Sequence, residues 1–140
     1  MHRSVTFCLR GIVGLWMVMF LTFAACSPAE GPEAIARTFT EQYYVSPDLV
    51  RAKALTYGLA RHKIEEEQRL IQGAPQGMGA PDREVSYSLH EMRKMGENKV
   101  FFVYDITISV DRRIMKKRAT IATGRVQEGW RVTNFQETDI

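Results

Sequence analysis

The stretch VFFVYDITISV, residues 100–110, decides the fold of this chain. Every second position carries a large apolar side chain, and this apolar face consists of Val100, Phe102, Tyr104, Ile106, Ile108 and Val110. Successive side chains of a strand point to opposite sides of a sheet, so a period of two predicts a β-strand with one buried face.

Shorter alternating stretches lie on both sides of this strand. They cover residues 85–90, 116–123 and 130–135, and turn-forming segments such as Gly96-Glu97-Asn98 and Gln127-Glu128-Gly129 separate them. Strands joined by short turns pair with their neighbours in antiparallel fashion. The C-terminal half therefore predicts a four-stranded antiparallel meander.

The preceding residues have a helical period instead. Ile35, Phe39 and Tyr43 recur every four residues after Pro32, and Ser46-Pro47-Asp48 can begin a second helical stretch. This stretch extends to Ile71, and Gly58 within it marks either a break into two helices or a close contact. Residues 73–82, GAPQGMGAPD, predict a loop. The expected fold class is α+β, with two or three N-terminal helices packed on the sheet.

The chain begins with a candidate export signal, MHRSVTFCLRGIVGLWMVMFLTFAAC. Arg3 and Arg10 supply a positive start, and residues 11–25 form an uncharged apolar run that suits a signal peptide better than a membrane span. The ending Phe23-Ala24-Ala25-Cys26 resembles the lipobox of bacterial lipoproteins. A cleaved secretory signal with a coincidental cysteine, or an uncleaved anchor, are the alternatives.

The lipobox resemblance implies lipid on the sulfur of Cys26, which becomes the new N-terminus. We therefore expect a signal peptide at 1–25, a lipidated cysteine and tether at 26–32, and a single domain at 33–140. Ser27 after the cysteine implies, by the same resemblance, sorting to the outer membrane on its periplasmic face. The expected location is the bacterial cell envelope, with the protein attached to the membrane through Cys26.

The remaining composition excludes several classes of function. Without the leader, which holds Arg3 and Arg10, 17 basic residues face 16 acidic ones, so no nucleic-acid partner is expected. Both cysteines, Cys8 and Cys26, lie in the leader region, so the domain has no disulfide and no thiolate metal site. We expect no metal and no cofactor.

The closing stretch GRVQEGWRVTNF, residues 124–135, looks like the last hairpin of the nuclear transport factor 2-like (cystatin-like) superfamily. The resemblance covers about residues 33–138 and rests on this hairpin and on the order of elements. It implies a curved sheet wrapped around helices, forming a cone with an apolar interior. Some relatives, such as ketosteroid isomerase and scytalone dehydratase, are enzymes, and others bind ligands or serve as scaffolds or parts of envelope secretion machines.

Two surfaces follow from this expected cone. A ligand pocket inside it would be lined by Tyr57, Phe102, Tyr104, Ile106 and Trp130. The outer face of the sheet is either a homodimer contact or simply exposed, and it carries Phe101, Val103, Thr107, Ser109, Thr120, Ala122 and Thr133.

A basic cluster is expected at one hairpin: Arg112, Arg113, Lys116, Lys117 and Arg118. It would contact anionic lipid, a polyanion or an acidic protein, or it is a solvated hairpin tip that discourages edge pairing.

No catalytic residues are predicted. Asp105 should point outward as a solvated or cross-strand paired carboxylate, although isomerase-like relatives use a carboxylate inside the cone as base. His62 and Glu66 share a helix face and predict an exposed pair more strongly than a metal pair. His90 shares a strand face with Ser86 and Ser88, without the signals of a serine nucleophile.

Three functions are compatible with these patterns. The first is a non-enzymatic envelope lipoprotein that binds a small ligand or an envelope protein. The second is an isomerase- or dehydratase-like enzyme that uses Asp105 or Tyr104 with a histidine in the cone. The third is a subunit of an envelope secretion or assembly complex.

Overall fold

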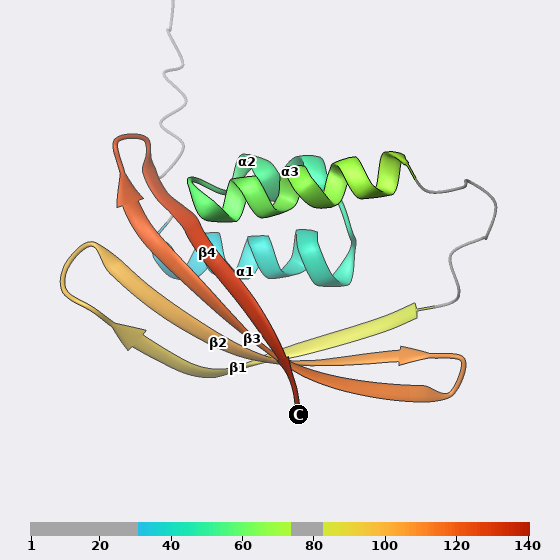
Figure 1. Cartoon of the computed structure of the whole chain (residues 1–140). Coiled ribbons are helices and arrows are strands. Elements are labelled where there is room, and N and C mark those ends of the chain that lie inside the picture. Colours follow the sequence, from blue (N-terminus) through green and yellow to red (C-terminus); the bar gives the residue numbers. More distant parts are fainter. Residues whose placement is uncertain (1–30, 74–82) are drawn as a thin grey trace, which may run out of the picture.

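Helices and sheet form two layers in the computed structural model, which describes residues 31–73 and 83–140 (Figure 1). Three α-helices and one π-helical turn pack on one face of a four-stranded antiparallel sheet, which confirms the predicted α+β class. The predicted signal peptide, Cys26 and most of the tether lie outside the described residues. Within the described part of the chain, no helix is long and apolar enough to span a membrane.

The helical layer contains three α-helices, in agreement with the two or three expected, and one π-helical turn that the periodicity does not indicate. It comprises α1 (Pro32–Thr40), the π-helical turn η1 (Glu41–Val45), α2 (Leu49–Ala54) and α3 (Leu59–Gln72). Gly58 separates α2 from α3. Its backbone has φ 60° and ψ −127°, a conformation that residues with a Cβ rarely adopt. Asp48, and not Ser46, caps α2, because its carboxylate accepts the backbone N–H groups of Val50 and Arg51 at 3.1 and 3.0 Å.

The sheet contains β1 (Arg83–Lys94), β2 (Lys99–Val110), β3 (Arg113–Val126) and β4 (Gly129–Asp139), in that spatial order. Three of the strands extend well beyond the apolar alternation that predicts them, because polar residues at their ends pair with the neighbouring strand as well. The register shifts between Leu89 and Glu91 in β1 and between Ala122 and Thr123 in β3. Such bulges bend a strand and increase its twist.

The core lies between the two layers. Val100, Phe102, Tyr104, Ile106 and Ile108 of β2 are buried, which confirms the predicted inner face of this strand. Phe39 of α1 packs against Phe135 of β4, with ring centroids 5.1 Å apart. Burial of each such large apolar side chain contributes roughly 1.5–3 kcal/mol.

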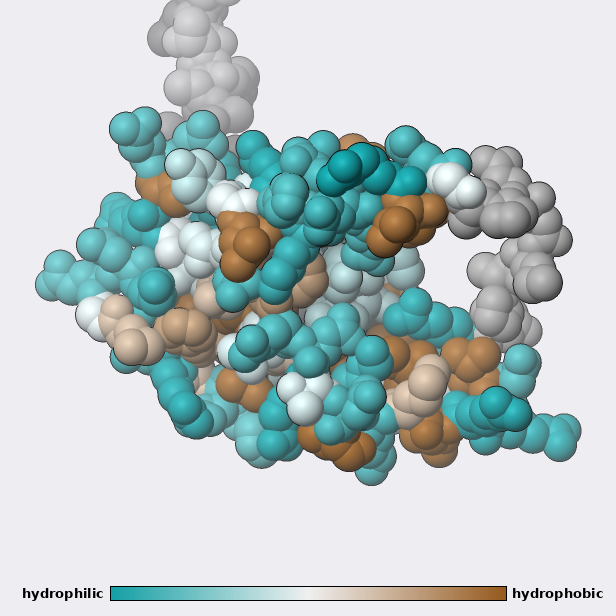
Figure 2. Space-filling model, viewed as in Figure 1, coloured by the Kyte–Doolittle hydropathy of each residue, from teal (hydrophilic) through white to brown (hydrophobic). Residues whose placement is uncertain are grey.

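The free edge of β4 is partly covered by the segment between α2 and α3. The backbone N–H of Tyr57 donates to the carbonyl of Val132, and the N–H of Val132 donates to the carbonyl of Leu55, both at 2.9 Å. These two bonds hold the segment next to Gly58 beside the sheet. They also give hydrogen-bond partners to the N–H and C=O groups of Val132, which would otherwise be unpaired at the edge of the sheet. On the face drawn in Figure 2, hydrophilic side chains cover most of the helical layer, with apolar patches between them.

Candidate functional site

An open hollow of about 340 Å³ lies between the helices and the sheet, and we call it the mouth pocket. The helical layer and the sheet both contribute side chains to it. Its lining consists of Tyr43, Tyr44, Pro47, Leu49, Glu67, Ile71, Arg83, Ile108, Lys117 and Glu137. The pocket therefore combines apolar, hydroxyl and charged groups, a mixture found in small-molecule sites.

The π-helical turn η1 supplies two of these side chains. Its wide geometry is marked by the bond from the N–H of Ser46 to the carbonyl of Glu41, five residues earlier, at 2.9 Å. Tyr43 stacks on Phe39, and the ring of Tyr44 meets that of Tyr43 edge-on at 4.8 Å between centroids. Single π-helical turns are rare and frequently occur at functional sites.

The hydroxyls of the two tyrosines have different surroundings. Tyr43 donates to Oε2 of Glu67 at 2.7 Å. The hydroxyl of Tyr44 is buried, and the carboxylate of Glu137 lies close enough to raise its pKa. The geometry of these two groups does not make a hydrogen bond, so the hydroxyl has no partner among the described residues. Burial is the main reason that the pKa values of Tyr43 and Tyr44 are raised, followed by the hydrogen bond to Glu67 at Tyr43 and by the charge of Glu137 at Tyr44. Both hydroxyls therefore remain protonated at neutral pH.

The charges of the mouth pocket are only partly neutralised. Nζ of Lys117 lies 2.7 Å from Oε2 of Glu137, and this hydrogen bond raises the pKa of Lys117. Arg83 donates through Nη2 to the carbonyl of Tyr44 at 3.1 Å. Neither Arg83 nor Glu67 forms an ion pair with a described residue. Arg83 and Glu67 thus line the same hollow without an oppositely charged partner among the described residues.

In the mouth pocket, Tyr44 can donate a hydrogen bond to a ligand. Arg83 can bind an anionic group of the ligand, and Glu67 can bind a cationic one. Its apolar side chains, including Leu49 and Ile108, can contact a hydrocarbon portion of the same molecule. Among the residues that the structure describes, no group of histidine, cysteine and acidic side chains could hold a metal ion. The arrangement suits the recognition of a small amphipathic molecule.

The pocket predicted inside the cone involves a different set of residues. Phe102, Tyr104 and Ile106 lie together in the buried core, and Trp130 packs against that core. Tyr57 is 54% exposed and lines another hollow, beside residues 125–128. A ligand among the core residues would have to displace packed side chains, and that site stays a prediction.

The sequence patterns do not predict the mouth pocket as a site. Tyr43 lies on the predicted apolar stripe of the first helix, and no sequence pattern singles out Glu67. The adjacent pair Tyr43-Tyr44 was an available signal, since two neighbouring tyrosines cannot both follow one helical stripe. Arg83 and Glu137 carried no signal, because their positions depend on how strand ends meet the helices.

The outer face of the sheet holds a separate charged cluster. The guanidinium of Arg118 donates to Asp105 at 2.8 and 3.3 Å, and Nδ1 of His90 lies 3.1 Å from the same carboxylate. The hydrogen bond from Arg118 is the main reason that the pKa of Asp105 is lowered. The prediction of a cross-strand paired Asp105 is confirmed.

An open hollow of about 530 Å³ lies on this outer face, next to the charged cluster. Its lining includes Phe101, Val103 and Thr120 from the predicted dimer surface. These three side chains are half-buried, as are Thr107, Ser109 and Thr133, whereas Ala122 is buried.

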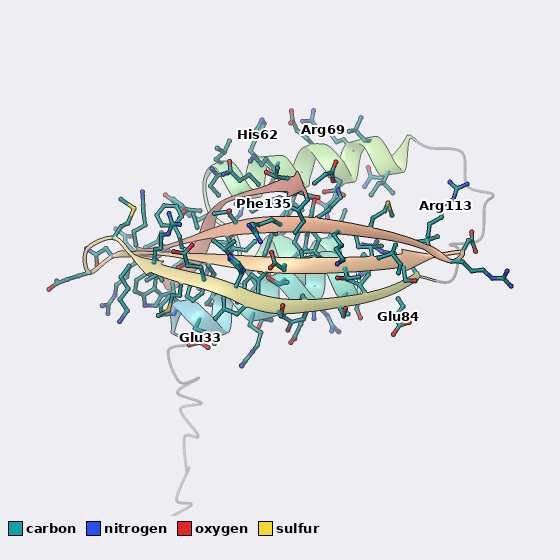
Figure 3. All side chains as sticks on the ribbon, turned by 90° about the horizontal axis from the view of Figure 1, so that it is seen from below. Glu33, His62, Arg69, Glu84, Arg113 and Phe135 are labelled. Atoms are coloured by element: carbon teal, nitrogen blue, oxygen red, sulfur yellow. The ribbon has the colours of Figure 1, made fainter. Side chains whose placement is uncertain are left out.

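The five basic residues near the β2–β3 hairpin do not form one surface. Lys117 lies opposite Ile106 on the inner face, and Arg118 lies opposite Asp105 on the outer face. Arg112, Arg113 and Lys116 remain exposed at the hairpin end, where Figure 3 shows Arg113 pointing away from the sheet.

His62 and Glu66 form the expected exposed pair on α3, with 3.5 Å between Nε2 and Oε1. Figure 3 shows His62 at the outer edge of α3. With Asp105 and His90 on the outer face, these side chains do not meet Tyr104 in the core. The acid–base set named in the sequence-based enzyme hypothesis is therefore not assembled inside the cone.

Comparisons with known proteins identify the fold. The sequence matches no family model and no curated protein. A ketosteroid isomerase-like protein from Erwinia carotovora atroseptica SCRI1043 is similar in structure, with 10% identity and a TM-score of 0.58 over 82% of this chain and 98% of that chain.

A second similar structure is a domain of unknown function with a cystatin-like fold from Nostoc punctiforme PCC 73102. It has 11% identity and a TM-score of 0.56 over 78% of this chain and 77% of that one. The described domain therefore has the nuclear transport factor 2-like, cystatin-like fold. Identities this low support the fold and nothing about activity.

Proposed function

We propose that this chain is a lipid-anchored protein of the bacterial cell envelope whose domain binds a small ligand in the mouth pocket without chemical change. The lipobox-like ending at Cys26 supports the anchor. The mixed lining of the mouth pocket supports the binding role, because small-molecule sites combine apolar walls with a few placed polar groups.

The buried hydroxyl of Tyr44 is the observation that carries the proposal. A buried polar group without a hydrogen-bond partner costs the folded state about 1–3 kcal/mol. Such groups are uncommon in native proteins and call for a specific explanation. A ligand that accepts a hydrogen bond from Tyr44 would remove this cost on binding.

The surrounding groups favour recognition over proton transfer. The raised pKa values of Tyr43 and Tyr44 hold both hydroxyls in the donor form. A general base or acid works best with a pKa near the working pH, which these tyrosines do not have. The two tyrosines are therefore suited to donate hydrogen bonds to a ligand.

Ligand binding can be tested on the full chain in detergent by thermal shift, with a panel of small anionic, cationic, zwitterionic and neutral molecules. We expect at least one class to raise the melting temperature of the wild type and to have a smaller effect on Tyr44→Phe. Tyr57→Phe is the matched control, because Tyr57 is exposed and lies in another hollow. A panel in which no class stabilises the wild type would refute the binding role.

The anchor is tested separately with labelled fatty acid in growing cells. The wild type and Cys8→Ala should incorporate the label, and Cys26→Ala should not, because only Cys26 follows the lipobox-like residues. Equal incorporation by all three proteins would contradict lipidation at Cys26.

A second candidate function is an isomerase- or dehydratase-type enzyme that works in the same mouth pocket. The proximity of the Tyr44 hydroxyl to Glu137 favours it, since a tyrosine donor beside a carboxylate is an arrangement used in proton abstraction. One of the similar structures is described as ketosteroid isomerase-like. Recovery of a bound ligand unchanged after long incubation supports binding, and its conversion supports the enzyme.

A further inference from the structure

We infer that the mouth pocket takes a small amphipathic zwitterion, the chemical class to which free apolar amino acids belong. The inference rests on the proposed ligand-binding function and adds the class of the ligand. It follows from the positions of two opposite charges, the orphaned hydroxyl of Tyr44 and the apolar part of the lining.

The two charges come from different layers of the domain. Glu67 belongs to α3, and Arg83 is the first residue of β1. Both side chains line the mouth pocket, but neither forms an ion pair with the other or with another described side chain. A molecule that carries both a cation and an anion can satisfy Glu67 and Arg83 together, whereas a molecule with one charge leaves the other residue unmatched.

Arg83 is prepared to bind a carboxylate. Its Nη2 atom is held by the carbonyl of Tyr44 at 3.1 Å, which fixes the guanidinium while leaving other N–H groups available. A guanidinium can bind a carboxylate through two parallel hydrogen bonds. Tyr44 also lines this pocket, and its buried hydroxyl is a donor without a partner among the described residues.

Glu67 is prepared to bind an ammonium group. Its Oε2 atom accepts the hydroxyl of Tyr43 at 2.7 Å, and the other carboxylate oxygen has no partner among the described residues. The other carboxylate of the pocket, Glu137, already forms an ion pair with Lys117, with 2.7 Å between Oε2 and Nζ. Glu67 is therefore the carboxylate that remains for an incoming cation.

The rest of the lining sets the size and character of the ligand. Pro47, Leu49 and Ile108 offer hydrocarbon surface next to the charged groups. The volume of about 340 Å³ is near the lower end of the range of roughly 300–1,000 Å³ for small-molecule sites. The pocket thus fits a small zwitterion with one apolar side chain.

The test is calorimetric titration of the full chain in detergent with leucine, N-acetyl-leucine and leucine amide. N-acetyl-leucine lacks the ammonium group, and leucine amide lacks the carboxylate. We expect leucine to bind and each blocked form to bind at least about tenfold more weakly, because one charged partner of the pocket is left unmatched.

Variants assign each charge to its residue. Glu67→Gln should remove the preference for leucine over N-acetyl-leucine, and Arg83→Gln should remove the preference for leucine over leucine amide. The matched controls Glu66→Gln and Arg61→Gln change exposed charges of the same helix and should keep both preferences.

Equal affinity for leucine and both blocked forms would overturn the zwitterion inference, and so would stabilisation only by another ligand class in the thermal-shift panel. In both cases the proposed binding function would stand. Absence of binding by every class in that panel would overturn the inference and the proposed function together.

Discussion

Two adjacent tyrosines of η1 differ in a way that can be measured. The hydroxyl of Tyr43 is bonded to Glu67, and that of Tyr44 is buried without a partner. The same deletion of a hydroxyl should therefore have different effects at the two positions.

Tyr43→Phe should lower the free energy of unfolding by about 1.5–3 kcal/mol, because a hydrogen bond to the carboxylate of Glu67 is lost. Tyr44→Phe should leave it unchanged or raise it, because an unsatisfied polar group leaves the core. Urea denaturation without ligand measures both. A clear loss of stability in Tyr44→Phe would show that its hydroxyl already has a partner in the free protein.

Asp105 gives a prediction about pH. Its pKa is lowered in the folded state, chiefly by Arg118, relative to about 3.9 in an unfolded chain. The contribution of this contact to stability is therefore present above the unfolded pKa and is lost as the pH falls through the folded pKa. The difference in unfolding free energy between the wild type and Asp105→Asn should shrink toward acid pH. A difference that does not change between neutral and acid pH would contradict the ion pair with Arg118.

For single residues, the sequence predicts the face of the sheet on which a strand residue lies. It does not predict the ion-pair partners of the charged residues. The alternation around Asp105 correctly placed it on the outer face of the sheet. The neighbours Lys117 and Arg118 look like part of one basic cluster in the sequence, but successive residues of a strand point to opposite faces of the sheet. Their partners, Glu137 and Asp105, depend on the register, which the composition of the cluster does not contain.

Among the elements, the break between α2 and α3 is the most sensitive to one substitution. Gly58 adopts φ 60° and ψ −127°, and a Cβ at this position would have no atom within 4 Å. Gly58→Ala should therefore destabilise the fold by about 1–3 kcal/mol through backbone strain alone. Gly73→Ala is the control, since Gly73 has φ −86° and space for a methyl group. Equal melting temperatures for the two variants would contradict the assigned backbone of Gly58.

Element types were readable from the sequence, but their irregularities were not. The period of two in residues 100–110 marked β2 because one face of that strand is buried along most of its length. The bulge at His90 and the π-helical turn at residues 41–45 depend on how neighbouring elements fit together. The mouth pocket is built at such an irregularity, which explains why the periodicity did not indicate it.

On the scale of the whole molecule, the mouth pocket lies away from the start of the domain. Figure 1 shows α1 beginning at one end of the molecule, while the C-terminal end of α3 and the start of β1 lie at the other. Glu67, Ile71 and Arg83 belong to that second end. With an anchor at Cys26, the proposed arrangement would direct the pocket away from the attachment point.

The outer face of the sheet is expected to be either a contact with a second copy of the chain or simply exposed. Val103 lies there beside an open hollow of about 530 Å³. If two copies pair through this face, Val103→Glu should produce a monomer by placing unpaired carboxylates in the contact. Sedimentation analysis in detergent distinguishes the two states. A wild type that is monomeric at all concentrations would contradict the dimer while leaving the mouth pocket unaffected.

The central claim is that the mouth pocket holds a small molecule, and native mass spectrometry of the protein purified from its own cell envelope tests it most directly. The wild type should carry a small-molecule adduct at about one equivalent, consistent with a single site. The Arg83→Gln variant should lose it, and the Arg61→Gln control should keep it. Spectra in which the wild type and both variants all lack an adduct, under conditions that preserve a known protein–ligand complex, would contradict the account.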